Sequence, residues 1–308
     1  MTGWRRHLAL GGGYVIFFAV VFTLTFYLSF DPSMFAPSII RHLKAGSPWL
    51  KDREVKIGEI SLYHLTGITF KDITISGAAH GDTSQPPITI RRLTLAPRLR
   101  SLPRTLAAVR AGKPPPISLS AYILEIADGR IKGSLTSAPD KFHFEALIKD
   151  PIQLAKLSVP SDKLGKTRLA GALTGEINLD FKDPKDPATG RGDIKLEIDK
   201  PEVKALTYAT LPIFDDLVMD KATLVLKLDG GKVTIDTLKL QGKDLPLNLQ
   251  GTIVLNQHLG QSAADVKGTV LLGEAFKARN PIAASYMKDN NNYVYTGPLS
   301  GMVPPGVF

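Results

Sequence analysis

The chain has 308 residues, of which 44% are hydrophobic and 22% charged, enough for one large or two smaller domains with a buried core. It contains no cysteine, which excludes disulfide frameworks, thiolate metal sites and cysteine nucleophiles. The net charge is +9, and residues 83–124 contribute seven basic and no acidic side chains to it.

In chain order, the first predicted element is a membrane anchor over residues 8–30. These 23 residues carry no charge and would span about 35 Å as a helix, more than a hydrocarbon core of about 30 Å. Trp4 and Tyr27 stand near the two ends, where aromatic side chains favour the membrane interface. A cleaved signal peptide is the alternative, but its apolar stretch is normally only about 7–15 residues long.

The basic N-terminus predicts the orientation of this anchor. Arg5 and Arg6 precede it, which favours a cytoplasmic location for residues 1–7. No later apolar stretch is as long, so the remainder of the chain should lie on the opposite side of the membrane. We therefore expect a juxtamembrane linker over residues 31–54 and one β-rich domain over residues 55–308, outside the cytoplasm.

After residue 54, alternation of apolar and polar residues with a period of two predicts strand after strand. The clearest examples are Ile177-Leu179-Phe181 and Ile194-Leu196-Ile198. Asp128-Gly129 and Asp229-Gly230 are typical of two-residue hairpin turns, whose central positions need positive φ. The predicted fold class is mainly β: an elongated, curled antiparallel sheet of about a dozen strands with a few short helices.

Three short helical segments are expected between the strands. Residues 99–111 place leucines and a valine at helical spacing, with Ser101 as a candidate cap. Shorter helical turns are expected over residues 151–157 and near residues 206–219.

A five-residue unit, apolar–x–Gly–x–apolar, recurs along the chain. Glycine inside a strand is typical of a bulge, a bend or a close approach of two backbones. Its recurrence predicts one long sheet that curls at corresponding positions, unless it is a chance result of composition. The glycines of this unit are Gly133, Gly175, Gly251, Gly268 and Gly301.

Motifs for catalysis and cofactor binding are missing from the sequence. The six histidines are too far apart for a zinc motif, and no nucleophile elbow, Walker loop or dinucleotide fingerprint occurs. We therefore expect a protein that is not an enzyme and that uses no cofactor or metal.

The basic segment over residues 91–113 is the most specific surface feature that the sequence predicts. Its residues lie in a helix with solvated arginines, or they contact anionic lipid headgroups or an acidic partner. Nucleic acid is excluded, because no aromatic residues are interleaved with the basic ones. The candidate contact residues are Arg91, Arg92, Arg98, Arg100, Arg104, Arg110 and Lys113.

The order of these elements resembles a known family. The stretches ISLSAYILEIADGRIKGSL (117–135), DGGKVTIDTLKLQGKDLPLNLQGTIVL (229–255) and YVYTGPLSG (293–301) follow an N-terminal anchor. This arrangement resembles protein N of the type II secretion system, which in turn is similar to the AsmA-like periplasmic proteins. The proline-rich end, MVPPGVF, departs from the family and puts the pairing of the last strand in doubt.

The resemblance implies a single-pass inner-membrane protein with its large domain in the periplasm. Its expected function is that of a non-enzymatic accessory component of the type II secretion machinery, which contacts other secretion-system proteins through sheet edges. The alternative is an AsmA-like lipid-binding or lipid-transfer module. An enzyme acting on envelope polymers is a third hypothesis without a supporting motif. For the lipid-binding alternative, the candidate groove residues are Val233, Ile235, Leu245, Leu247 and Leu249.

Overall fold

The computed structural model describes most of the chain after residue 35. The described residues are 33, 36–46, 48–51, 53–63, 67–78, 87–98, 107, 110, 116–138, 140–157, 168–183, 186–204, 206–208, 211–214, 216–256, 261–281 and 292–298. The predicted anchor over residues 8–30 lies outside them. Within the described part, no helix is both long and apolar enough to cross a bilayer.

Strands dominate the described part of the chain. The helices there are α2 (Ala36–Gly46), α3 (Pro48–Lys51) and α5 (Glu274–Arg279), with single 3-10 turns η3 (Leu154–Lys156) and η4 (Pro187–Thr189). The strands are β1 (Arg53–Tyr63), β2 (Gly67–Ala78), β3 (Ile88–Pro97), β4 (Ile117–Ile126), β5 (Gly129–Ala138), β6 (Lys141–Gln153), β7 (Arg168–Phe181), β8 (Gly190–Lys204), β9 (Leu206–Tyr208), β10 (Leu211–Phe214), β11 (Leu217–Val218), β12 (Lys221–Asp229), β13 (Lys232–Gln241), β14 (Leu247–Val254), β15 (Ala263–Val270) and β16 (Asn292–Pro298).

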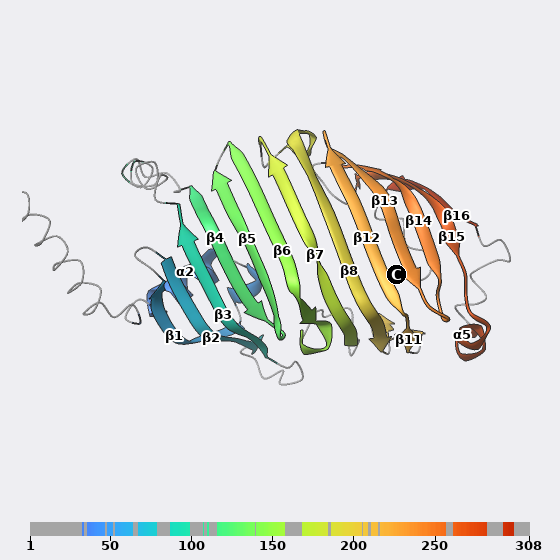
Figure 1. Ribbon diagram of the computed structural model, residues 1–308, viewed down its shortest axis with the longest axis horizontal. Helices are drawn as coiled ribbons and strands as arrows, with labels where there is room; N and C mark the ends of the chain where they lie inside the picture. The colour runs from blue at the N-terminus through green and yellow to red at the C-terminus, as the bar shows by residue number, and fades with distance from the viewer. Residues whose placement is uncertain are drawn as a thin grey trace, which may run out of the picture.

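One antiparallel sheet contains all of these strands except the small β9–β10 hairpin. Its order is β1 to β8, then β12 to β16, and β11 also pairs with β8. The strands lie side by side from β1 to β16, and the β13–β16 end curves back (Figure 1). Neighbours in the sequence are thus neighbours in the sheet, as short hairpin connections dictate. The predicted β-rich antiparallel fold is confirmed.

The shorter predicted elements have mixed outcomes. The turn expected over residues 151–157 is η3, whereas residues near 206–219 form the short strands β9, β10 and β11, so the helical prediction there is wrong. Of the predicted helix over residues 99–111, only Ala107 and Arg110 are described, and both are helical. The segment expected to be a linker contains α2 and α3, and the first strand begins at Arg53.

The β4–β5 hairpin turn lies one residue earlier than predicted. Its central residues are Ala127 and Asp128, with φ of 49° and 62°, and Ile126 pairs with Gly129. Gly129 is therefore the first residue of β5 and not part of the turn. In the β12–β13 hairpin the central residues are Gly230 and Gly231, again one step from the predicted pair.

Buried residues form packed clusters at the two ends of the sheet. At the first end, α2 and α3 pack on β1–β3, around Val55, Ile60, Phe70 and Ile73. At the other end, the curvature of β13–β16 buries Ile235, Leu249, Ala264 and Val266. A third cluster joins α5 to β11 and the residue that follows it: Leu217, Met219 and Phe276.

Candidate functional site

One face of the sheet is apolar along its whole length. Starting from Ile60 and following the residue paired in each successive strand, a single row of neighbours crosses thirteen strands without meeting a charged side chain. We name it row A: Ile60, Phe70, Leu93, Leu124, Ile131, Ile148, Gly175, Leu196, Leu224, Leu238, Leu249, Gly268 and Tyr293. At about 4.8 Å per strand, this row is about 58 Å long.

A second row runs beside the first on the same face. It lies two residues along each strand except in β13, where a register shift makes the step from Leu238 to Ile235 three residues. It also crosses thirteen strands without a charge. We name it row B: Leu62, Ile68, Leu95, Tyr122, Gly133, Ala146, Ile177, Ile194, Leu226, Ile235, Gly251, Val266 and Tyr295. Together the two rows form an apolar track, the first candidate site of the molecule.

The recurring glycines lie in these two rows. Gly175 and Gly268 belong to row A, and Gly133 and Gly251 to row B. A Cβ at each would overlap a backbone oxygen of the neighbouring strand. The backbones can approach so closely only because glycine has no side chain. Of the three features expected for such glycines, namely a bulge, a bend or a close approach, these four show the close approach. Gly301 lies outside the described residues.

The apolar track is not uniformly covered. No residue of β7 or β12 is fully buried, and the track residues of β8 are also half-buried. In contrast, the track residues of β6 are buried, and Val266 in β15 has 0% exposure. The central strands β7, β8 and β12 therefore present partly exposed aliphatic side chains, such as Leu196 and Leu224.

The five predicted groove residues are in two places. Val233, Ile235, Leu247 and Leu249 lie on the apolar face of β13 and β14, where Ile235 and Leu249 are buried in the curved end. Leu245 precedes β14 and packs with Leu217, Met219 and Phe276.

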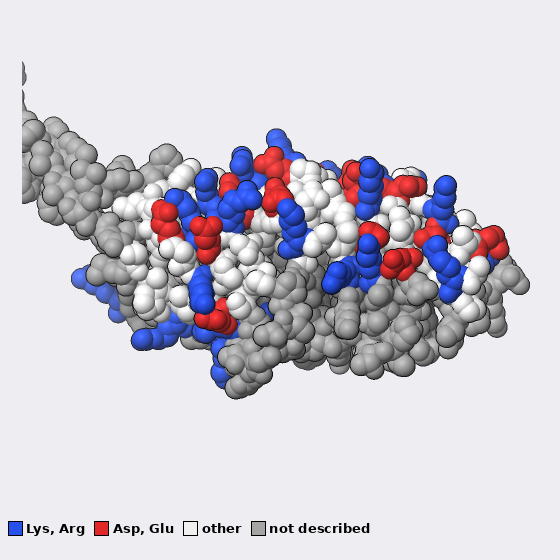
Figure 2. Space-filling model, turned by 90° about the horizontal axis from the view of Figure 1, so that it is seen from below, with Lys and Arg blue, Asp and Glu red and all other residues white. Residues whose placement is uncertain are grey.

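The opposite face of the sheet is charged. In a view from the strand ends, acidic and basic side chains lie close to one another along the length of the molecule (Figure 2). Cross-strand ion pairs with N–O distances of 2.7–2.8 Å join Lys71 to Glu59, Lys195 to Glu176 and Lys221 to Glu197. Such exposed pairs stabilise a fold little, but they keep this face hydrated and leave the apolar face as the surface that can accept an apolar partner.

Only part of the predicted basic set is described. Arg91, Arg92, Arg98 and Arg110 are exposed, whereas Arg100, Arg104 and Lys113 lie outside the described residues. Arg92 belongs to a network on the charged face, in which Glu125 lies 3.7 Å from Arg92 and 3.3 Å from Arg130.

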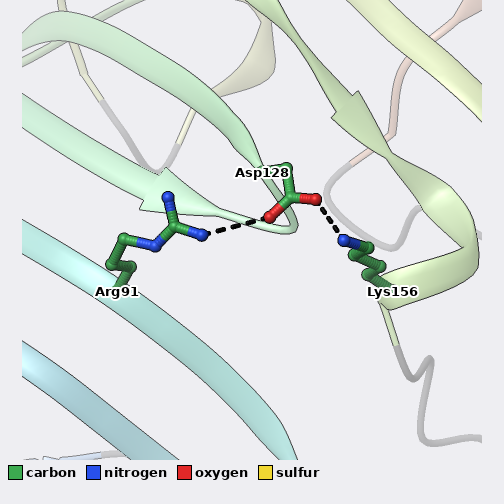
Figure 3. Close-up of polar contacts among 3 residues, drawn as sticks. All are labelled: Arg91, Asp128 and Lys156. Carbon is green, nitrogen blue, oxygen red and sulfur yellow. Dashed lines mark hydrogen bonds and ion pairs between the residues drawn. The ribbon is translucent and has the colours of Figure 1, made fainter.

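Arg91 forms a second candidate site, a polar pocket at the rim of the sheet. Its guanidinium donates to Asp128 at 3.2 Å, and Lys156 of η3 donates to the other carboxylate oxygen of Asp128 (Figure 3). The hydrogen bond from Lys156 lowers the pKa of Asp128, and attraction to both cations acts in the same direction. The pocket has a volume of about 260 Å³, and its lining is Pro87, Thr89, Arg91, Glu125, Ile126, Ala127, Asp128, Gly129 and Lys156.

Lys156 and Asp128 were not predicted from the sequence as members of this site. They are 28 positions apart, and only the pairing of β5 with β6 brings them together. Within the described ranges, no group of three or more His, Asp or Glu residues is arranged to hold a metal ion.

Comparisons with family models, with curated proteins and with solved structures find no match to the chain. The resemblance to protein N of the type II secretion system therefore stays a prediction. The apolar track and the rim pocket are the two features of the molecule that indicate a function.

Proposed function

We propose that this chain is a non-enzymatic lipid-binding protein that holds acyl chains along its apolar track. The observation that carries this proposal is the continuity of rows A and B, which cross thirteen strands without a charge and stay partly exposed in β7, β8 and β12. Apolar surface of this extent is unusual on a protein without a partner and is typical of a binding surface.

The dimensions of the track favour acyl chains as its occupant. One acyl chain spans about 15 Å, half of a hydrocarbon core of about 30 Å, so a track of about 58 Å exceeds it roughly fourfold. A protein partner would need polar groups at the interface to fix its orientation. Neither row contains a charged residue, as expected for a surface that binds a flexible hydrocarbon chain at many equivalent positions.

Helix α2 gives an example of what the apolar face accepts. Ile39 and Ile40 of this helix pack against the cluster around Ile60 and Phe70, at the β1 end of the track. The contact is apolar on both sides. The predicted membrane anchor precedes α2 in the chain, so this end of the track would be the one nearer to the membrane.

Fluorescence quenching by lipids with brominated acyl chains tests the proposal on the full chain. Leu224 in row A is replaced by tryptophan, and its sequence neighbour Thr223, on the opposite face, is replaced in a matched control. Both substitutions are uncharged, and the wild type corrects for the native tryptophans. We expect strong quenching in Leu224→Trp and little in Thr223→Trp. Equal quenching in the two variants, or none in either, would overturn the proposal.

Strand addition to a secretion-system partner is the second candidate function. Within the described part of the chain, β1 and β16 each pair with a single strand, and Val294 on β16 is 73% exposed. Open edges of this kind can accept a partner strand. Crosslinking in native membranes from Val294 tests it: a secretion-system protein among the products supports this function, and products without one contradict it.

A further inference from the structure

Two cations and one carboxylate converge on the rim pocket from three separate segments. Arg91 comes from β3, Asp128 from the β4–β5 turn and Lys156 from η3 (Figure 3). The side chain of Arg91 is 69% exposed and that of Lys156 is 57% exposed. Each donates one hydrogen bond to Asp128, although arginine carries five N–H donors and lysine three. The pocket thus has donor capacity beyond what Asp128 uses.

Local packing holds this pocket in shape. The backbone N–H of Gln153 donates to the carbonyl oxygen of Ala127 at 2.9 Å, which ties the turn to the end of β6. Ala127 and Asp128 both have positive φ, which is unfavourable for residues other than glycine. Positive φ at both positions is what a two-residue hairpin turn requires, so the turn that carries Asp128 has a defined shape.

The second carboxylate of the pocket lining, that of Glu125, is paired with arginines outside the pocket. Glu125 is the only other acidic residue of the described lining, and it lies 3.3 Å from Arg130 and 3.7 Å from Arg92. Two cations therefore share the single carboxylate of Asp128. An additional anion would balance the excess positive charge of Arg91 and Lys156 and accept the hydrogen bonds that they do not donate to Asp128.

We propose that the rim pocket binds the phosphate group of an anionic lipid whose acyl chains lie on the apolar track. This inference rests on the proposed function and names its ligand class. A phosphate offers several acceptor oxygens, which suit the fork of an arginine and the point charge of a lysine.

The pocket and the track are adjacent, as such a ligand requires. Ile126 lines the pocket and belongs to the apolar face, where it pairs with Ile90 of β3. Leu124 of row A lies two residues earlier on the same strand and the same face. A headgroup in the pocket thus leaves its acyl chains beside row A.

Calorimetric titration of the full chain tests this assignment with three probes: dihexanoyl phosphatidic acid, dihexanoylglycerol and inorganic phosphate. The first two have the same acyl chains and differ in the phosphate. We expect phosphatidic acid to bind more tightly than the other two probes. Arg91→Gln and Lys156→Gln should each weaken its binding about fivefold, the value for one basic residue beside a charged surface.

Asp128→Asn provides a variant with the opposite expected result. It removes the internal carboxylate that occupies both cations, so phosphatidic acid should bind about fivefold more tightly. Asparagine tolerates positive φ, so the turn is preserved. Lys195→Gln is the matched control, because Lys195 is also 57% exposed and pairs with a carboxylate on a distant part of the sheet. It should leave the affinity unchanged.

The outcomes separate this inference from the proposed function. Equal binding of both lipids, insensitive to Arg91 and Lys156, overturns the phosphate site and leaves acyl binding intact. No binding of either lipid overturns the proposed function, and the headgroup assignment with it. Inorganic phosphate that binds as tightly as phosphatidic acid and responds to the same variants identifies free phosphate as the ligand and contradicts a lipid source.

Discussion

Gly129 packs directly against Ile152: a Cβ at position 129 would lie 2.6 Å from the Cα of Ile152. The carbonyl oxygen of Pro151 would be equally close. No side chain fits there, so β5 must begin with glycine and the turn must form from Ala127 and Asp128. The close packing of β5 on the end of β6 thus determines where the hairpin turns.

We expect Gly129→Ala to destabilise the protein by about 3 kcal/mol, the upper part of the range for overpacking, because the clash is with backbone atoms. Urea unfolding followed by circular dichroism measures it. Gly230→Ala is the control, since a Cβ there meets nothing closer than 4.0 Å, and positive φ alone should cost about 1 kcal/mol. Equal losses of stability in the two variants would show that the clash with Ile152 adds no cost, and that packing does not require glycine at position 129.

The turn illustrates what the sequence could and could not predict. Aspartate followed by glycine correctly indicated a hairpin near residue 128, because turn preferences are local. The one-residue error arose because Gly129 is required by Ile152, 23 positions away. Likewise, the strands could be predicted, because the alternation of apolar and polar residues is a local pattern within each strand. The recurring glycines indicated a bulge, a bend or a close backbone approach, and only the structure distinguishes these three.

Other parts depended on tertiary contacts that no local pattern encodes. The aliphatic residues of α2 form a buried face only against β1–β3, and the helix was not predicted. Lys156 becomes part of a site only through Asp128. To predict rows A and B from the sequence, the register of all twelve strand pairs would have to be known. A shift by one residue in any pair would move charged side chains onto the apolar face.

Gly175 in row A provides a second test of the close backbone approach. A Cβ there would overlap the carbonyl oxygen of Lys195, and φ is +147°, so alanine is disfavoured by both space and conformation. We expect Gly175→Ala to cost about 3 kcal/mol in unfolding free energy. Asn178→Ala, at an exposed position of the same strand, should stay within about 0.5 kcal/mol of the wild type. A loss below about 1 kcal/mol for Gly175→Ala would contradict the close approach.

Asp244 connects α5 to the sheet. It is buried, accepts a hydrogen bond from Arg279 at 3.0 Å and accepts another from the backbone N–H of Val218 at 3.2 Å. Asp244→Ala loses both bonds and leaves the N–H of Val218 without this partner, so we expect a loss of about 3 kcal/mol. Arg279→Ala should cost less, about 2 kcal/mol, because it leaves Asp244 buried without its cation but with its bond to Val218. The two single variants in urea unfolding check this order, and a larger loss for Arg279→Ala would reverse the interpretation.

We expect Tyr122 to make the free energy of unfolding depend on pH in the alkaline range. Tyr122 is the strand partner of Gly133, and its hydroxyl donates to the backbone oxygen of Glu145 at 2.9 Å. Burial together with the charge of Glu145 raises its pKa to about 12. An unfolded tyrosine titrates at about 10. Between these two values the folded protein keeps a proton that the unfolded chain has released. The contribution of Tyr122 is therefore complete below pH of about 10 and is lost as the pH rises toward 12.

Tyr122→Phe removes this titration and the hydrogen bond. At neutral pH we expect the variant to be about 1 kcal/mol less stable than the wild type. Above pH of about 10, the wild type should lose this advantage progressively, so the two stability curves converge toward pH 12. Thermal unfolding at several pH values measures the convergence, and phenolate absorbance should show that the variant lacks one late-titrating tyrosine. Curves that stay parallel up to pH 12 would mean that Tyr122 ionises as readily in the folded protein as in the unfolded chain.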